Sequence, residues 1–400
     1  MIKFIKKLFN ADCLASTILV FVAMVLLPLI LSFHFFIPLK NAFYDFAITD
    51  INYAKLRSPE KELADTNIVL VDISGMSNDE LANMINILNE NKPRVIGIDK
   101  LLKLESDSTA NAKLASVLER VNRLVLSDRL VCDKNKAIFD SIIYSPKLYS
   151  QFGVSGFTNQ ITIKDKSHET VRTFKTYTKV GDSIVYPFPV EVVNMYDPQK
   201  VQFLYNRNNK EEIINFRGYF NKYFFIAGSQ VLDKEFNPNL FTGKILLLSY
   251  FDPFKTSSLF AYKYYSPLEK EYTGKSFPDI SGIEIHANVI SMILNENYFN
   301  IIPSWLAVVM AFVFCYFTIF LYIYIDEKIS TWYELLSLFI FIIESTIFII
   351  ANYESYHHMM LDLNLDYSLF AIILASPLYE AYTKSIKPLI IRLSKKKMHR

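Results

Sequence analysis

The sequence predicts an α/β extracytoplasmic domain, with a mixed or mostly parallel sheet, flanking helices and an inserted hairpin, plus four transmembrane α-helices. Three observations predict this class. Hydrophobic residues make up 52% and aromatic residues 15% of the 400 residues, which is high for a soluble protein. Long apolar runs lie near both ends of the chain. Between them, short apolar runs alternate with amphipathic segments, as expected for buried strands and covering helices.

The apolar runs near the two ends predict the transmembrane helices. They cover residues 14–37, 304–325, 332–351 and 367–384. Runs of this length can cross a bilayer. No small-residue cleavage site follows the first run, so we interpret it as an uncleaved signal anchor after a cytoplasmic stretch, residues 1–13.

Basic residues predict the orientation of these helices. The loop between the third and fourth runs contains no Lys or Arg, whereas the tail at 385–400 is basic. The positive-inside rule therefore places both termini in the cytoplasm. Residues 38–302 are then exported as one domain.

The first part of this domain predicts alternating strands and helices. Apolar runs at 67–73, 94–99 and 123–128 have strand length. Ser77 and Glu80 form a capping-box pattern that opens a helix after the first strand, and a second helix is expected at 109–121. Right-handed crossovers would place the three strands parallel in one sheet.

The second part of the domain continues this pattern. Residues 170–187 alternate around Gly181 and Asp182, which indicates a hairpin turn. A short helix is expected at 188–196, a buried strand at 244–250 and a helix at 282–296 that leads into the second span.

Each of the three early strands ends in an aspartate. These are Asp72, Asp99 and Asp128. The carboxyl ends of parallel strands line the usual ligand crevice, so the three side chains are candidate ligand-binding residues for a hard cation or a basic ligand. Alternatively, each aspartate caps the helix or turn that follows it.

Three further residues are candidates for coupling or for structure. Glu284 and His286 open the helix at 282–296. Glu284 is favourable near a helix start, and the pair can lock this helix to the sheet. Glu344 lies inside the third span, where a carboxyl is a functional candidate by default. Alternatively, Glu344 bonds a neighbouring helix and fixes packing.

The sequence argues against several function classes. The net charge of +2 does not indicate a nucleic-acid binder. We find no P-loop, no His-Glu-x-x-His, no Gly-x-Ser-x-Gly and no Cys-x-x-Cys motif. The three cysteines are isolated in the sequence. We therefore predict no enzyme, no catalytic residue, no metal and no cofactor.

The order of features resembles the CHASE2 family of bacterial extracytoplasmic sensory domains. The first strands NIVLVDIS and RVIGIDKLL, the hairpin with Arg172, the segment Asn215–Gly218 and the stretch LDKEFNPNLFTGKILLLSY each resemble parts of the family pattern. GIEIHANVISMIL at 282–294 is the most specific match. One span before and three after the domain also resemble the family topology.

Two departures from the family pattern concern a ligand pocket. GMSN stands where a Trp-Pro-Trp-like segment is usual, and Leu248-Ser249-Tyr250 stands where Ile-Gly-Ala is usual. If that late loop bounds a pocket, the pocket of this protein differs from that of its relatives or is lost.

The resemblance implies a sensor of the bacterial cytoplasmic membrane. We expect it to detect an unknown signal outside and to act through a membrane or cytoplasmic protein partner in trans, since only a basic tail follows the fourth span. The tail can also bind membrane lipid. The alternative is a scaffold subunit of an envelope complex, suggested by the aromatic stretches 219–225 and 260–265. The small-molecule ligand is unknown, and a homo-oligomer is left open.

Overall fold

The computed structural model describes residues 10–31, 50, 63–133, 138–160, 170–251, 263–268 and 278–398. The chain divides into two compact units. The α/β unit comprises Thr49–Tyr298, and the helical unit comprises Met1–Ile48 with Phe299–Arg400. Each is described by itself.

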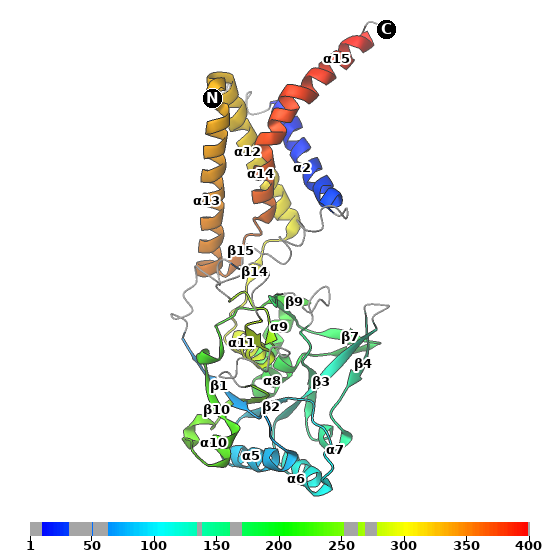
Figure 1. The fold of residues 1–400 in the computed structure, drawn as a ribbon, viewed down its shortest axis with the longest axis vertical. Helices are drawn as coiled ribbons and strands as arrows, with labels where there is room; N and C mark the ends of the chain where they lie inside the picture. Colours follow the sequence, from blue (N-terminus) through cyan, green and yellow to red (C-terminus); the bar gives the residue numbers. More distant parts are fainter. Residues whose placement is uncertain are drawn as a thin grey trace. The chain divides into compact units, whose positions relative to one another are not determined.

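A central sheet organises the α/β unit (Figure 1). Its strands are β1 (Asp65–Asp72), β2 (Val95–Asp99), β3 (Leu124–Asp133), β4 (Ile138–Ile143), β5 (Val154–Phe157), β10 (Tyr223–Ala227) and β11 (Ile245–Ser249). Their order is β10-β1-β11-β2-β3-β4, and β5 also pairs with β3. All pairs are parallel except β3–β4. The predicted mostly parallel sheet is confirmed, with β11 inserted between the first two strands.

Helices α5 (Asn78–Glu90) and α6 (Ser108–Leu118) cover one face of the sheet, with α7 (Lys147–Ser150) and α10 (Gly228–Leu232) beside them (Figure 1). Most side chains between these helices and the sheet are apolar, and Asn78, Asn111 and Tyr149 form a small buried polar cluster there. The apolar side chains include Val69, Val71, Leu81, Leu88, Ile96, Ile98, Leu114, Leu126, Leu246 and Leu248. Burial of this cluster is the main favourable term for the fold of this layer.

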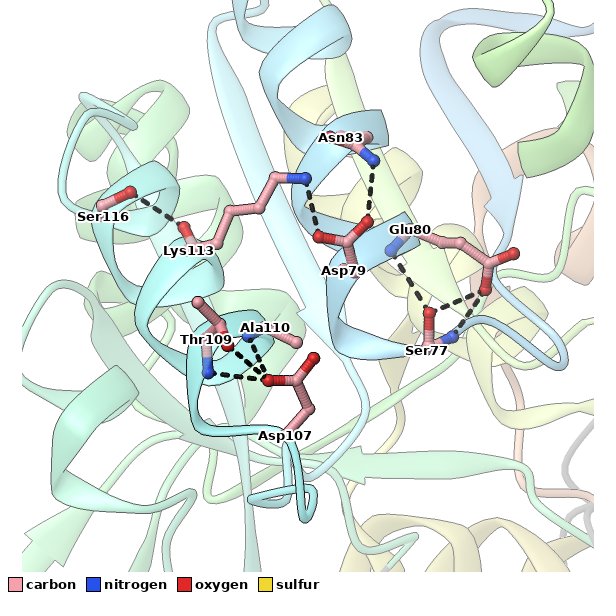
Figure 2. A network of polar contacts seen from close by, with 9 residues as sticks. All are labelled: Ser77, Asp79, Glu80, Asn83, Asp107, Thr109, Ala110, Lys113 and Ser116. Atoms are coloured by element: carbon pink, nitrogen blue, oxygen red, sulfur yellow. Dashed lines mark hydrogen bonds and ion pairs between the residues drawn. The ribbon is translucent and has the colours of Figure 1, made fainter.

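Polar contacts fix the starts of these two helices (Figure 2). The predicted capping box is present, since Ser77 N donates to Glu80 Oε2 over 2.9 Å and Glu80 N donates to Ser77 Oγ over 3.3 Å. Asp107 accepts bonds from the first backbone N–H groups of α6. Lys113 of α6 forms an ion pair with Asp79 of α5 over 2.6 Å.

Helices α8 (Phe188–Tyr196) and α11 (Gly282–Leu294) cover the opposite face, and α9 (Pro198–Asn206) follows α8 (Figure 1). Two strand glycines let α8 approach closely. A Cβ on Gly97 would lie 2.9 Å from the Phe188 ring, and a Cβ on Gly156 would lie 2.7 Å from the Phe188 backbone. The backbone of α8 therefore rests directly on β5.

Short antiparallel pairs complete the α/β unit. The predicted hairpin is formed by β7 (Thr178–Val180) and β8 (Ser183–Val185), with Gly181 at a φ of 58° in the turn. The preceding strand β6 (Thr173–Lys175) pairs instead with β9 (Glu211–Ile213). The smallest elements are η4 (Phe220–Lys222), η5 (Pro238–Leu240), β12 (Lys263–Tyr264) and β13 (Ile280–Ser281).

The helical unit contains α2 (Ala11–Leu31), α12 (Ser304–Ile329), η7 (Ser330–Trp332), α13 (Tyr333–Met359), α14 (Asp366–Ala381), the π-helical turn η8 (Tyr382–Ile386) and α15 (Lys387–Met398). Strands β14 (Asn300–Ile301) and β15 (Leu361–Asp362) pair with each other. Buried contacts join α2, α12, α13 and α14 through Cys13, Val20, Cys315, Ile319, Tyr322, Tyr333, Ala371, Ala375 and Tyr379.

One helical stretch among the described residues, Ser304–Met359, is long and apolar enough to cross a membrane. It folds back on itself at η7, because Thr318 of α12 lies beside Glu344 of α13. Ala11–Leu27 is a shorter apolar helix. Residues 32–37 of the first predicted span lie outside the described residues. The four-span topology remains a prediction.

Candidate functional site

Two of the three strand-end aspartates lie at the same level of the sheet. The register pairs Asp72 with Ser249 and Ser249 with Asp99. Ser249 of β11 thus stands between the two carboxyl groups, at the carboxyl edge of the parallel strands. This edge is where parallel α/β sheets usually bind ligands.

Asp72 bonds the loops around it. Its Oδ1 accepts from Ser74 N over 2.8 Å, from Ser74 Oγ over 2.5 Å and from Phe251 N over 3.1 Å. These bonds tie the loop after β1 to the loop after β11. The capping role that we weighed as the alternative therefore describes the contacts of Asp72, and ligand binding by this residue stays a prediction.

Asp99 has fewer partners than Asp72. Ser249 Oγ lies 3.3 Å from Asp99 Oδ2 and 3.2 Å from its backbone oxygen. Burial raises the pKa of Asp99 to about 6, although the bond from Ser249 opposes this rise. Since Ser249 stands where the family pattern has glycine, this contact belongs to the departure noted in the sequence.

Asp128 stands apart from the other two aspartates. The last parallel pair of β2 and β3 is Ile98–Leu126, so Asp128 lies one position beyond the level of Asp99. It pairs with Phe157 of β5 and is only 5% exposed. Its Oδ1 is buried without a hydrogen-bond partner within the described part of the chain. Burial first, and then the charge of Glu191, raise its pKa to about 7.

The described residues contain no cluster of three or more His, Cys, Asp or Glu side chains that would hold a metal ion. The aspartates therefore form a pair around Ser249 and a separate third group. Joint binding of one cation by all three carboxyls has no geometric support within the described ranges.

Glu284 caps α11 and bonds a distant segment. Its Oε2 accepts from Ser281 N over 2.8 Å and from Ser281 Oγ over 2.7 Å. Its Oε1 accepts from Phe220 N over 2.8 Å. Burial raises the pKa of Glu284, and these bonds oppose the rise. Glu284 thus holds the start of α11 to η4.

His286 is 3% exposed and packs against α8. Its ring centre lies 5.4 Å from that of Phe188. Burial lowers the pKa of His286 to about 3, so the ring is neutral at pH 7. This environment is that of a packed core side chain and does not offer a charged group to a ligand.

A buried polar row on α11 continues from Glu284 and was not predicted from the sequence. Asn288 Oδ1 accepts from Arg217 N over 2.7 Å, and its Nδ2 donates to Gly218 O over 2.9 Å. Ser291 Oγ accepts from Arg217 Nε over 3.0 Å and donates to Asp65 Oδ2 over 2.7 Å. The spacing 284, 288, 291 places these residues on one helix face, a periodic signal that was available in the sequence.

The row joins three separated pieces of chain. Arg217 Nη1 donates to Leu63 O over 2.6 Å, just before β1. Asn215 Nδ2 donates to Asn297 O over 3.2 Å, just after α11. The segment Asn215–Gly218, which carried part of the family resemblance, is therefore bonded along the length of α11.

Other buried polar contacts border this network. Tyr219 Oη donates to Asp279 Oδ2 over 2.8 Å, and Ser266 N donates to Asp279 Oδ1 over 2.8 Å. Burial raises the pKa of Asp279 to about 6. Arg172 forms a two-pronged ion pair with buried Asp50. The contacts of Asp279 thus lie just before the start of α11.

Glu344 lies in the helical unit. Both of its carboxyl oxygens are 3.0 Å from Thr318 Oγ1 of α12. The helix-to-helix contact that we weighed as the packing alternative is therefore present. The observed contact is compatible with either role of Glu344.

An α/β domain joined in sequence to an apolar helical unit defines the class of this protein. Residues 17–320 match the CHASE2 domain family, and since this is more than half of the chain, the protein belongs to that family. CHASE2 domains are sensory and extracytoplasmic, so this is a membrane protein with a sensory domain outside the cytoplasm. No curated protein and no solved structure matches the chain.

Proposed function

We propose that this protein is an integral membrane sensor that acts through a partner protein in trans, without catalytic output of its own. Residues 38–302 detect the signal, and the spans pass it to the partner. The observation that supports this most is the polar row of α11. It bonds the segment Asn215–Gly218 and the start of β1, and the chain runs from α11 into α12 within ten residues.

A sensor that transmits a signal through α11 needs two conformational states of its domain. Only a ligand with different affinity for two conformations shifts their populations. The carboxyl edge at Asp72, Ser249 and Asp99 is the proposed entry point for such a signal. Glu344, which bonds Thr318, is proposed to hold the spans to each other or to a partner span.

The multi-pass topology is part of the same proposal. Large apolar side chains are exposed along α12 and α13, as expected for helices that face lipid; they include Trp305, Val309, Phe317, Leu338, Phe339, Ile343 and Ile350. Four spans place both termini in the cytoplasm. Cys132, which is partly exposed in the α/β unit, would then react with an impermeant maleimide added outside intact cells. Labelling of Cys132 only after permeabilisation contradicts this topology, and Cys132→Ser is the control.

The trans mechanism is tested by purification of the tagged chain in mild detergent, followed by mass spectrometry. A co-purifying cytoplasmic enzyme is the expected result. Glu344→Gln should reduce its recovery several-fold, whereas Glu354→Gln, at an exposed position of the same helix, should not. Purification of the chain without an effector contradicts action in trans.

Recovery of envelope proteins in a fixed ratio would instead favour the scaffold alternative. The aromatic residues that suggested a docking surface pack on each other in part. The rings of Phe220, Phe225 and Phe251 lie 5.6–6.4 Å apart in edge-to-face contacts. Residues 260–262 of the second aromatic stretch lie outside the described residues.

A further inference from the structure

Polar contacts join the ends of three helices at one end of the helical unit. Tyr382 Oη donates to Asp12 Oδ1 over 2.9 Å, and Lys387 Nζ forms an ion pair with Asp12 Oδ2 over 2.6 Å. Tyr379 Oη donates to Asp326 Oδ2 over 3.0 Å. Asp12 lies in the first turn of α2 and Asp326 in the last turn of α12. The start of α2, the end of α12 and the end of α14 therefore lie at one level of the unit.

Exposed aromatic side chains lie at the same end. Tyr324, near the end of α12, is 53% exposed, and Trp332, in the turn η7, is 57% exposed. The apolar stretch Ser304–Met359 turns back at η7. Tyr and Trp gather where a membrane meets water, because their rings combine an apolar body with a polar group. These residues therefore mark the level of the lipid headgroups.

Helix α15 begins at this level. It follows α14 through the π-helical turn η8, which contains Tyr382 and is closed by the Lys384–Glu380 ion pair over 2.8 Å. Turns of this kind are common causes of a change in helix direction. Figure 1 shows α15 extending away from α13 beyond the end of α14. The bonds of Asp12 to Tyr382 and Lys387 thus fix the point where α15 leaves the helical unit.

Helix α15 combines exposed apolar side chains with positive charge. Leu389, Ile390 and Leu393 are 57%, 54% and 59% exposed, and their spacing places them on one helix face. Arg392 beside them is also exposed. From 385 to 400 the sequence contains no Asp or Glu, and its basic residues are Lys387, Arg392, Lys395, Lys396, Lys397 and Arg400. Such a composition is typical of helices that lie in the headgroup region of a membrane.

Position and charge together favour a lipid surface over an acidic protein as the partner of α15. The helix starts at the level of the headgroups, so its apolar face can enter the acyl boundary without any further component. Anionic headgroups complement the basic residues, and each Lys or Arg near such a surface strengthens binding about fivefold.

We propose that α15 is an interfacial helix that binds anionic phospholipid. Leu389, Ile390 and Leu393 enter the boundary of the acyl chains, and Arg392 with the three lysines at 395–397 binds the phosphate groups. The proposal goes beyond the proposed sensor function, because it assigns a lipid partner to the segment after the last helix of the unit. It rests on the membrane placement of the helical unit and on no signal or partner protein.

Fluorescence of the full chain in nanodiscs tests the proposal. Ile390→Cys in a Cys132→Ser background carries an environment-sensitive dye, since Cys13 and Cys315 are fully buried. The emission should shift to shorter wavelength in nanodiscs of phosphatidylcholine mixed with phosphatidylglycerol, and far less in phosphatidylcholine alone. Replacement of Arg392 and the three lysines by Gln should abolish the difference between the lipids. Lys179→Gln, at an exposed position of β7, should leave it unchanged.

The same emission in both lipids would overturn the proposal, as would an undiminished shift in the fourfold variant or an equal loss in the Lys179 control. A shift that appears only when a cytoplasmic extract is added would also overturn it, because the partner would then be a protein. Arg392→Gln alone should weaken the lipid-dependent shift about fivefold and keeps the test decisive if the fourfold variant fails to fold. Since no effector is present, failure here is distinct from a failure of signalling in trans.

Discussion

The two faces of the central sheet bury different kinds of side chain. Against α5 and α6 most buried side chains are apolar, and one small buried polar cluster, Asn78, Asn111 and Tyr149, lies at the helix starts. Against α8 and α11 the structure buries a longer polar row on one helix, Glu284, Asn288 and Ser291, together with the ring of His286.

This difference indicates that the two faces of the sheet have different roles. An apolar layer packs in one close arrangement and supplies stability. A buried polar network is sensitive to the loss or protonation of single groups, because each unpaired member is costly. We infer that the α5/α6 face mainly stabilises the domain and that the α8/α11 face changes in response to a signal.

The largest expected effect concerns the protonation of Asp128. Its pKa is about 7 in the folded protein, so between pH 4 and pH 7 the folded state holds a proton that the unfolded chain releases. Stability should therefore fall as pH rises through this window, by about 4 kcal/mol from this group. Asp128→Asn should remove that part of the slope in denaturant melts measured across this pH range. An unchanged slope contradicts the buried, unpaired state of Asp128.

Loss of side-chain volume on the apolar α5/α6 face should destabilise the domain. Leu81 is fully buried in the cluster under α5, and Leu81→Ala should destabilise the domain by about 3 kcal/mol at any pH. Leu104→Ala, at a side chain that is 56% exposed, is the matched control and should change little. Thermal melts at two pH values check both. A strong pH dependence of the destabilisation by Leu81→Ala would contradict the proposed difference between the two faces.

The polar row should respond to the loss of hydrogen bonds. Asn288→Ala leaves the backbone groups of Arg217 and Gly218 without their partner, which should cost about 2 kcal/mol. Asn83→Ala, on the exposed side of α5, should cost far less. If the two variants melt alike, Asn288 does not hold the segment Asn215–Gly218 to α11.

The smallest expected effect is at the helix start of α5. Ser77→Ala removes one half of the capping box and should destabilise the domain by about 1 kcal/mol. Ser77→Asp keeps an acceptor and should recover most of that loss. No recovery would show that the hydroxyl serves another contact.

Local patterns in the sequence predict the strands and helices well where burial is regular. Runs such as NIVLVDI and the Ser77–Glu80 pair lie in β1 and at the start of α5, since apolar runs and caps are local signals. The insertion of β11 between β1 and β2 depends on contacts between distant segments, which periodicity does not encode.

The site was less predictable for the same reason. The positions of the strand ends in the sequence do not show that Asp72 and Asp99 flank Ser249. They also do not show that Asp128 lies one position further on, because both facts depend on strand register. The spacing of Glu284, Asn288 and Ser291 was visible, but Arg217, the partner of Asn288 and Ser291, lies about 70 residues away.

Hydrogen exchange on the full chain in detergent, compared between the wild type and Asn288→Ala, tests the division between the two faces most directly. The account predicts that protection changes in α8 and α11, residues 188–196 and 282–294, while α5, residues 78–90, stays the same. A uniform change, a change confined to α5, or no change in α11 would contradict it.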